Sequence, residues 1–529
     1  MVCSVAYIIR PLSIPPPVSS PSSTPAVVSM EQQQPMGDYF LDKAYVTIIH
    51  NELEIDPAKV ALYSLYKTHP QARIVAIIPD TFSEDNATSI QSIGLNTAVI
   101  KAPSASSSAT LDTTEIWNFV PTTLEKLLYF STEIMFQKNV DHYFGYVAHT
   151  VLKKDAAIGL KVLERGEQTS SSSLLIPETF PMADQEVFWF HGPMKPWNAH
   201  QYHGIDWQTH YNPLPFYHWR HLHDELAFSN KGETAQWINQ DRRRLLCDDA
   251  SSTMMSPKNN IDQFTVLLST YNPERIQHLQ LLIQHLLQST QAHKIFVTWH
   301  NPHLDVPDAL LQMGERVTIL QQSYDSLNNR FNPINAIETE AVYIIDDDVL
   351  VDIQDIEFTF EVWRLNKDSI VGHFPRLHGY NPETHKGSYR VPKDDEAYSM
   401  ILTKSMFART DYLFTYTCLL DKELHHIIDE RTNCEDIAFN MMVSGMTGAK
   451  SIAVIPSKPM IDYGGKKGIS TNNHHMEERR ECAGRFITEY WDAVDPLIMS
   501  HSAVVRRVGP QIQKGRWENM QADLHSSFV

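Results

Sequence analysis

The sequence has no run of about 18 or more apolar residues, the length that a membrane-spanning helix requires. It is also short of cations, because 44 lysine and arginine residues stand against 63 aspartate and glutamate residues, for a formal net charge of -19. Nucleic-acid binding depends on clustered cations that neutralise phosphates, so this deficit argues against a nucleic-acid partner. An anionic nucleotide-sugar is compatible with it, because one divalent metal ion can neutralise a diphosphate locally.

Cysteine and glycine motifs are also missing. The five cysteines include no Cys-x-x-Cys spacing, which argues against a zinc site. An odd number of cysteines is ordinary in a reduced cytosolic protein, so the count alone leaves the compartment open. The sequence has no P-loop, and no Gly-x-Gly-x-x-Gly follows its first predicted strand, so dehydrogenases and ATPases lose their main support. We therefore expect any nucleotide to be held by a metal ion and side chains rather than by a glycine-rich loop.

Two stretches of the chain alternate predicted strands with helices, a rhythm typical of parallel sheets covered by helices. The first has predicted strands at 44–49, 72–78 and 95–100 and a helix at 57–68. The second has predicted strands at 264–269, 295–299, 317–321 and 341–345 and a helix at 274–288. The sequence therefore predicts an α/β protein with two domains in tandem, at 43–245 and 261–495.

The remaining segments are predicted to be irregular. Residues 1–40 are rich in proline and serine, which indicates a disordered arm, and their short apolar patch makes a poor signal peptide. Residues 186–223 are dense in aromatic residues, histidine and proline, and we expect a packed irregular region there. We predict a linker at 246–260 and a mobile tail at 500–529.

Three consecutive aspartates, Asp346, Asp347 and Asp348, follow the last apolar strand of the second stretch. Ligand sites in open α/β sheets lie outside the carboxyl ends of the strands. Carboxylates at positions i and i+2 can share one hard cation, whose other ligands are waters and phosphate oxygens. The alternative is a solvated turn, in which aspartate is common. We favour a site, and we expect positive side chains near it because three adjacent carboxylates repel one another.

The second stretch resembles the exostosin-like domain of glycosyltransferase family 64 over residues 261–495. The motifs that carry the resemblance are residues 264–271 (FTVLLSTY), 299–301 (WHN), 307–308 (PD), 328–331 (NNRF), 346–348 (DDD), 398–400 (YSM), 433–438 (NCEDIA) and 478–482 (ERREC). The resemblance implies a GT-A (Rossmann-like) fold. It also implies retaining transfer of an N-acetylhexosamine or related sugar from a UDP-sugar, with Mn²⁺ or Mg²⁺ as the metal.

The same resemblance implies roles for single residues, which we state as expectations. The donor nucleotide would be held by Asn301, Asn329, Arg330, Asp346 and Asp347, and the metal by Asp348. The catalytic residues beside the reacting sugar would be Asp436 and Arg479. Cys434 and Cys482 would form a disulfide, which requires an oxidising compartment.

Two of these residues have plainer interpretations. Asp436 precedes an apolar stretch and could simply cap a helix. Arg479 lies in a charged run, which usually indicates a solvated helix face. The family pattern favours function for both.

The first stretch resembles glycosyltransferase family 8, the glycogenin-like enzymes, more distantly. The residues concerned are 44–47 (AYVT), 61–65 (ALYSL), 126–129 (KLLY), 138–141 (KNVD) and 190–197 (FHGPMKPW). Where that family has two metal-binding aspartates, this chain has Ser131, Thr132 and Glu133. The resemblance therefore implies a second GT-A domain that is non-catalytic, and shared fold alone is the alternative.

Taken together, the sequence predicts a glycosyltransferase that acts on a glycan or glycolipid acceptor in the secretory lumen, in the Golgi or endoplasmic reticulum. Membrane association and a homo- or hetero-oligomer with other glycosyltransferases are compatible with it. A mannosyl-type enzyme that uses a GDP-sugar and a non-catalytic sugar-binding scaffold are the alternatives.

Overall fold

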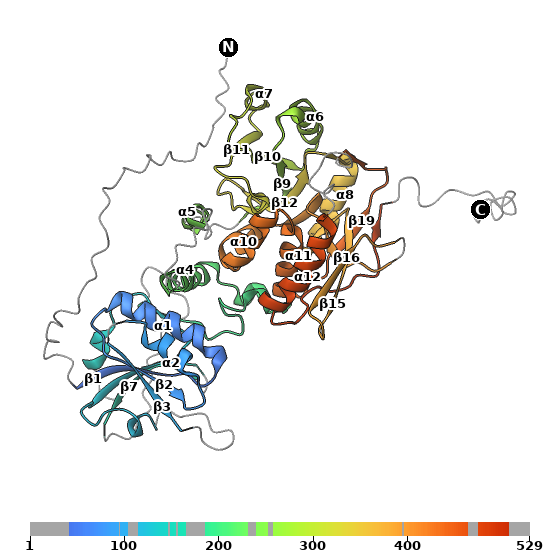
Figure 1. The fold of residues 1–529 in the computed structure, drawn as a ribbon. Coiled ribbons are helices and arrows are strands. Elements are labelled where there is room, and N and C mark those ends of the chain that lie inside the picture. The colour runs from blue at the N-terminus through green and yellow to red at the C-terminus, as the bar shows by residue number, and fades with distance from the viewer. Residues whose placement is uncertain are drawn as a thin grey trace, which may run out of the picture. The chain divides into compact units, whose positions relative to one another are not determined.

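The computed structural model describes residues 42–94, 96–103, 115–145, 149–154, 157–165, 186–230, 240–251, 258–393, 396–463 and 474–506. The predicted arm at 1–40, and the tail beyond residue 506, lie outside these ranges. The chain divides into two compact units, coloured by chain position in Figure 1. We call them the N-terminal unit (described residues up to 251, with 414–426) and the C-terminal unit (258–413 and 427–506). Within the described ranges, no helix is both long and apolar enough to span a membrane.

The N-terminal unit is built on a six-stranded sheet with the strand order β3-β2-β1-β4-β7-β6. Strands β1 to β4 are parallel, and β7 runs antiparallel to β4 and to β6. β5 and β8 form a separate pair. The strands are β1 (Lys43–Ile48), β2 (Ile74–Pro79), β3 (Thr97–Ala102), β4 (Lys126–Phe130), β5 (Ile134–Phe136), β6 (His149–Lys154), β7 (Ala157–Glu164) and β8 (Val187–Trp189).

Of the helices of the N-terminal unit, the sequence predicted only α1. The α-helices are α1 (Ile55–Thr68), α2 (Glu84–Gln91), α3 (Trp207–His210), α4 (Pro213–Asn230) and α5 (Gln240–Ser251), and the short helices are η2 (Glu52–Glu54), η3 (Ile116–Asn118), η4 (Asp141–Gly145) and η6 (Ala199–Gln201). The expectation that residues 186–223 are irregular is therefore wrong at β8, at α3 and from Pro213 onward. Proline is well tolerated in the first turn of a helix, and α4 buries Phe216, Tyr217 and Trp219.

The predicted linker at 246–260 is wrong in its first part, where helix α5 lies. It continues to Ser251, and the next strand, β9 (Asn260–Thr270), begins at the other end of that range. Cys247 lies within α5, is 1% exposed, and forms a disulfide with Cys418, with 5.7 Å between the two Cα atoms. The first part of the range is thus a covalently fixed helix, while residues 252–257 lie outside the described residues.

Residues 414–426 belong to the N-terminal unit although they lie far along the chain. They contain the π-helix η9 (Thr415–Leu419) and the start of α10 (Lys422–Arg431). Besides the disulfide, the Tyr211 hydroxyl lies 2.6 Å from the Thr415 hydroxyl, and Arg220 Nη1 lies 3.7 Å from Asp421 Oδ2. The predicted domain 261–495 is therefore not one continuous structural unit.

Replacing Cys418 by serine is expected to lower the free energy of unfolding of the N-terminal unit by about 2–5 kcal/mol, the usual cost of losing a native disulfide. The measurement is urea unfolding of the oxidised protein. The double variant Cys247→Ser/Cys418→Ser is the matched control, because it removes the same bond and should lose no more than the single variant. Unchanged unfolding of Cys418→Ser would show that this disulfide does not stabilise the segment.

The C-terminal unit has an eight-stranded sheet with the order β11-β10-β9-β12-β18-β14-β19-β21. Strands β9 to β12 are parallel, and β18 is antiparallel to β12 and to β14. Its strands are β9, β10 (Ala292–Trp299), β11 (Val317–Gln321), β12 (Thr339–Asp346), β14 (Val371–Gly372), β18 (Ser405–Arg409), β19 (Ile452–Ile455) and β21 (Val504–Val505). The smaller sheets pair β13 (Val349–Leu350) with β20 (Ile461–Asp462), and β15 (Pro375–Asn381) with β16 (Lys386–Arg390) and β17 (Met400–Ile401).

Helices cover this sheet, and α11 and α12 lie side by side in Figure 1. The helices are η7 (Pro273–Arg275), α6 (Ile276–Leu286), α7 (Asp308–Leu311), η8 (Leu327–Phe331), α8 (Ile353–Arg364), α9 (Asp411–Phe414), α10, α11 (Glu435–Thr447) and α12 (His475–Tyr490). The predicted strands of both stretches match observed strands to within a few residues. The predicted mobile tail is wrong at its start, because β21 pairs with β19 and Ser500 bridges to Tyr398.

Alternate residues of the central strands form the core of the C-terminal unit. Phe264 on β9 and Tyr343 on β12 are buried and pack edge to face, with ring centroids 6.0 Å apart. Phe360 on α8 and Phe407 on β18 join them, with centroids 5.1 Å from that of Phe264. Each such side chain stabilises the fold by about 1.5–3 kcal/mol through burial. This core fixes β12, and with it the three aspartates at the carboxyl end of that strand.

Candidate functional site

The triple aspartate lies where the sequence predicted it, at the carboxyl end of the parallel strand β12. Asp346 is the last residue of β12, and Asp347 and Asp348 form the turn into β13. The backbone of this turn is held by β20, because the Tyr463 amide donates to the Asp348 carbonyl at 2.8 Å. The expected positive side chains are present, since Arg275 and Lys404 both lie within ion-pair distance of Asp348.

Both carboxylate oxygens of Asp347 accept hydrogen bonds from other side chains of the protein. Its Oδ2 accepts a 2.7 Å hydrogen bond from the Thr270 hydroxyl at the end of β9, and its Oδ1 accepts one of 2.7 Å from Arg275 Nη1. Burial raises the pKa of Asp347, and the bonds from Thr270 and Arg275 oppose this shift. Both oxygens therefore position the turn, which leaves less capacity for the nucleotide contact that we expected from Asp347.

Asp346 and Asp348 retain free acceptor capacity. Oδ1 of each is buried and accepts no hydrogen bond. The nearest cations to Asp348 are Lys404 Nζ at 3.5 Å from Oδ1 and Arg275 Nη1 at 3.4 Å from Oδ2. Burial, and then repulsion by Asp346, raise the pKa of Asp348. Unsatisfied, mutually repelling carboxylate oxygens fit a hard divalent cation. Across the described ranges no three histidine, cysteine, aspartate or glutamate side chains gather around one point, so waters and phosphates would complete the coordination.

Arg330 on η8 connects the aspartates to a second acidic group. Its Nη1 lies 3.2 Å from Asp346 Oδ1 and 3.5 Å from Glu435 Oε1, and it donates a 2.5 Å hydrogen bond to the Thr403 hydroxyl. The Arg330 side chain is 9% exposed. Sequence reasoning named Arg330 as a nucleotide-binding residue, and the structure places it between two carboxylates.

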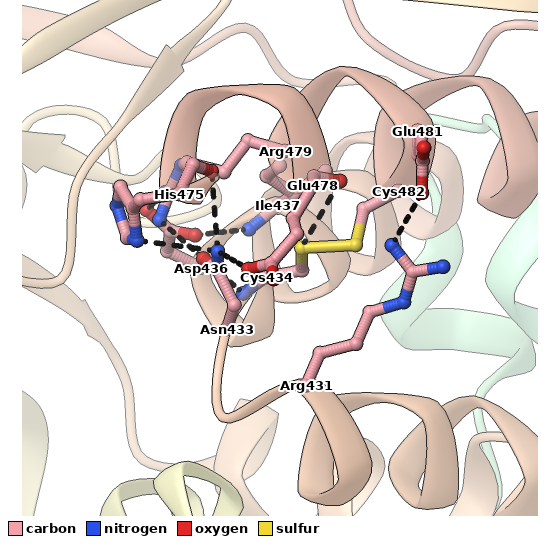
Figure 2. The surroundings of a disulfide bond; sticks show 10 residues. All are labelled: Arg431, Asn433, Cys434, Asp436, Ile437, His475, Glu478, Arg479, Glu481 and Cys482. Atoms are coloured by element: carbon pink, nitrogen blue, oxygen red, sulfur yellow. Dashed lines mark hydrogen bonds and ion pairs between the residues drawn. A yellow bond between two sulfur atoms is a disulfide. The ribbon is translucent and has the colours of Figure 1, made fainter. Parts of the chain in front are cut away.

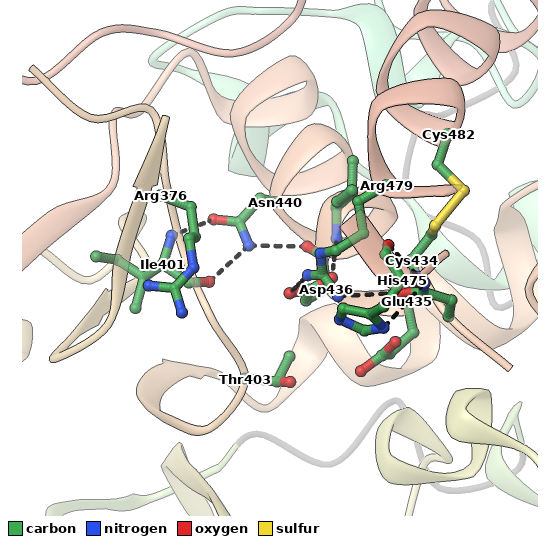
Figure 3. A network of polar contacts seen from close by, with 12 residues as sticks. Arg376, Ile401, Thr403, Cys434, Glu435, Asp436, Asn440, His475, Arg479 and Cys482 are labelled. Carbon is green, nitrogen blue, oxygen red and sulfur yellow. Dashed lines mark hydrogen bonds and ion pairs between the residues drawn. A yellow bond between two sulfur atoms is a disulfide. The ribbon is translucent and has the colours of Figure 1, made fainter. Parts of the chain in front are cut away.

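Asp436 and Arg479 form a buried ion pair between α11 and α12, shown in Figure 3. Arg479 also donates a 3.1 Å hydrogen bond to the Asn433 side chain, and its guanidinium lies 4.6 Å from the centre of the Tyr389 ring. Arg479 is 6% exposed, which excludes the solvated helix face considered above. Asp436 Oδ1 accepts a 2.9 Å bond from the Ile437 amide in the first turn of α11, so the helix-terminal role exists alongside the ion pair.

The predicted disulfide between Cys434 and Cys482 is present (Figure 2), with 6.3 Å between the Cα atoms. It fastens the start of α11 to α12 beside the Asp436–Arg479 pair. A second close contact positions α12, because Gly484 and Gly387 of β16 meet backbone to backbone. A Cβ atom at Gly484 would lie 2.6 Å from the Gly387 nitrogen. Arg479 is therefore placed by a covalent bond on one side and by a contact that only glycine permits on another.

The two expected asparagines are turned toward their own loops. Asn301 accepts a 3.0 Å hydrogen bond from the His303 amide, and Asn329 donates one of 2.8 Å to the Tyr324 carbonyl. Both asparagines are buried. Next to Asn301, burial, and then the charge of Arg330, lower the pKa of His300 to about 3, so this buried ring is neutral.

Sequence reasoning missed three residues of this site: Arg275, Lys404 and Glu435. Glu435 belongs to the motif at 433–438 (NCEDIA), in which the family resemblance implies a catalytic role only for its neighbour Asp436. Burial, with repulsion by Asp436, raises the pKa of Glu435 to about 7, against the opposing charges of Arg330 and Arg479. Arg275 and Lys404 carried no motif, and only the general expectation of nearby cations pointed to them.

The N-terminal unit has a comparable strand end. Its β4 neighbours β1 as β12 neighbours β9, and each is followed in the sheet by an antiparallel strand. The residues after β4 are Ser131, Thr132 and Glu133, and Lys195 Nζ forms an ion pair with Glu133. A lysine of the chain thus pairs with the one carboxylate present.

Comparison with known proteins concerns mainly the C-terminal half. The model of the Glycosyl transferase family 64 domain matches residues 264–508, which extends beyond the end at residue 495 that we predicted. The chain is 34% identical over 292 residues to Glycosyltransferase family protein 64 C3 of Arabidopsis thaliana, covering 50% of this chain and 86% of that protein.

Two further relatives match over a similar region. Exostosin-2 of Homo sapiens is 33% identical over 232 residues, covering 43% of this chain and 32% of that protein. Glycosylinositol phosphorylceramide mannosyl transferase 1 of Arabidopsis thaliana is 29% identical over 245 residues, covering 43% of this chain and 72% of that protein. The family 8 resemblance of the first stretch remains a prediction. The identity to the first relative, nearly all of whose length is covered, shows that this chain belongs to glycosyltransferase family 64 and is a glycosyltransferase.

Proposed function

We propose that the chain catalyses the metal-dependent, retaining transfer of an N-acetylhexosamine or related sugar from a UDP-sugar to a glycan or glycolipid acceptor. The observation that carries this proposal is the pair of buried carboxylate oxygens on Asp346 and Asp348 that accept no hydrogen bond, and Arg330 connects Asp346 to the acidic start of α11. A diphosphate donor brings the anionic oxygens that such a metal site lacks.

Asp346 and Asp348 would hold Mn²⁺ or Mg²⁺, which when bound offsets the charge that develops on the leaving diphosphate. Arg479 and Asp436 would lie beside the reacting sugar. Each oxygen of Asp436 accepts a hydrogen bond, one from Arg479 and one from the Ile437 amide, which makes this carboxylate a weak nucleophile. We infer that Asp436 stabilises positive charge on the sugar electrostatically rather than by forming a covalent bond to it.

A GDP-sugar is the alternative to a UDP-sugar as the donor. The Arabidopsis relative named a mannosyl transferase is covered over 72% of its length, which favours a GDP-sugar as the alternative donor. The name of that relative also includes a phosphorylceramide, which favours a glycolipid among the possible acceptors. The proposed assembly with other glycosyltransferases, and membrane association, rest on the family alone.

We place the chain in the lumen of the secretory pathway, in the Golgi or endoplasmic reticulum. Two disulfides, Cys247–Cys418 and Cys434–Cys482, support this compartment because structural disulfides persist in oxidising surroundings. They join residues 171 and 48 positions apart, so neither bond follows from chain proximity alone.

The test uses the full oxidised chain in thermal unfolding with UDP-GlcNAc, UDP-GalNAc, UDP-glucose or GDP-mannose, each with Mn²⁺ or EDTA. One donor should stabilise the protein only with the metal, by about 2.7 kcal/mol at a hundred times its Kd. Slow release of that donor's nucleotide should accompany the shift. Stabilisation without nucleotide release would favour the sugar-binding scaffold, and no response to any donor would contradict the proposed function.

A further inference from the structure

Glu435 is the first residue of α11 and follows the disulfide-bonded Cys434 directly. Its side chain is 8% exposed, and its Oε1 lies 3.5 Å from Arg330 Nη1. The same nitrogen lies 3.2 Å from Asp346 Oδ1. Glu435 and Asp346 thus sit at the two ends of a bridge that passes through one guanidinium group.

Glu435 is not the N-terminal cap residue of α11, which is Cys434, and its ionised carboxylate is favoured locally by a hydrogen bond with its own backbone amide. A buried carboxylate is unfavourable unless it is well paired. The ion pair between Glu435 and Arg330 is weak, because Arg330 also pairs with Asp346. The short hydrogen bond of Arg330 goes to the Thr403 hydroxyl and not to Glu435. Figure 3 shows Glu435 beside the Asp436–Arg479 pair. Burial of the Glu435 carboxylate therefore lowers the stability of the fold, while the residues that surround it belong to the candidate site.

We propose that Glu435 is a positioning residue for the donor nucleotide, whose ionised carboxylate holds Arg330 in place and thereby sets the orientation of Asp346. This inference rests on the proposed function, because it concerns the same donor site. Asp346 lies at the carboxyl end of β12, where a diphosphate and its metal would bind, so a displaced Arg330 would loosen the donor. Glu435 itself need not touch the donor.

The groups around Glu435 give this role a pH dependence. Arg330 on η8 and Arg479 on α12 favour its ionised form, while burial and Asp436 on its own helix favour the protonated form. His475 on α12 also lies near Asp436 and Arg479, and burial lowers its pKa. Since burial raises the pKa of Glu435 to about 7, the carboxylate gains a proton as the pH falls through neutrality. Donor binding should therefore weaken toward acid pH.

The experiment measures UDP binding to the full oxidised protein with Mn²⁺ by titration calorimetry, with GDP in its place if only GDP-mannose stabilises the wild type. As the pH falls from about 8 to about 6, the wild-type Kd should rise about tenfold, as expected for a carboxyl group that titrates in this range. Glu435→Gln should bind about tenfold more weakly at the higher pH and lose most of that slope. Any slope left in the variant belongs to other titrating groups, the terminal phosphate of UDP among them, so the difference between the two curves is the readout.

Thr403→Val is the matched control, because it removes another partner of Arg330 without removing a titrating group. It should weaken UDP binding and keep the wild-type slope. If Glu435→Gln does not fold, Glu435→Asp replaces it, and this variant should bind more weakly with a slope still present. A wild-type slope that survives in Glu435→Gln, or no slope in the wild type, overturns the inference alone. No nucleotide binding by the wild type at any pH overturns the proposed function as well.

Discussion

Asp348→Asn is expected to abolish metal-dependent turnover while the protein stays folded. Asparagine has nearly the same shape but removes the ligand charge, and Asp348 Oδ1 is one of the two buried oxygens at the end of β12 that accept no hydrogen bond. The loss in kcat should reach about a thousandfold, which corresponds to about 4 kcal/mol of transition-state stabilisation. Turnover at saturating donor and metal, with thermal unfolding as the folding control, is the measurement.

Although Asp348→Asn is expected to abolish turnover, it is not expected to destabilise the metal-free protein. The raised pKa of Asp348 means that its ionised form destabilises the metal-free fold, a cost that grows as the pH rises from the ordinary carboxyl range through the folded pKa. Asp348→Asn removes this cost, so the variant in EDTA should be at least as stable as the wild type at neutral pH. Asp347→Ala is the contrasting variant and should lose stability instead, because it removes both oxygens that accept the hydrogen bonds from Thr270 and Arg275. Full activity of Asp348→Asn would remove Asp348 from the metal site.

Arg479→Met is expected to lower the free energy of unfolding by about 3–5 kcal/mol, because it leaves the Asp436 carboxylate buried without its partner. Asp436 is 3% exposed, so water cannot replace the lost guanidinium without opening the contact between α11 and α12. Turnover should also fall, since Arg479 is proposed to lie beside the reacting sugar and to position Asp436 there. Chemical unfolding and kcat are the two measurements.

Arg480→Met is the matched control on the same helix. Arg480 is exposed, so its loss should change stability by no more than about 0.5 kcal/mol. The double variant Asp436→Asn/Arg479→Met separates the two effects of Arg479. It should recover part of the stability, because the uncompensated charge is gone, but none of the activity. Recovered activity in the double variant would show that the pair serves the fold and not the reaction.

The strands and the position of the triple aspartate could be predicted because apolar periodicity reports them directly. Strand β12 reads as a continuous apolar run ending in Asp346, and a strand buried on both faces leaves that pattern. Helix α5 could not be predicted in the same way. Its sequence, QDRRRLLCDDAS, is strongly polar, and its place in the fold depends on a disulfide to a residue far along the chain.

The contacts of the site were less predictable than its motifs. The pairing of Cys434 with Cys482 followed from the family pattern, and the structure contains it. That Arg275 would bind Asp347, or that Arg330 would lie between Asp346 and Glu435, depends on how distant segments meet. Neither local structural propensity nor the spacing of residues in the sequence predicts such tertiary contacts. The roles of Asn301 and Asn329 in nucleotide binding stay predictions.

The packing of residues 414–426 in the N-terminal unit has a consequence for how this protein can be inherited. These residues lie inside the match to the family 64 domain, yet their disulfide partner, Cys247, lies before it. A recombination event that joined the coding sequence of residues 258–529 to another gene would carry Cys418 without Cys247. Cys418, which is buried in this structure, would then have a free thiol and would lack the residues that cover it here. The two halves of the gene are therefore expected to pass from ancestor to descendant together, unless the sequence of 414–426 changes at the same time.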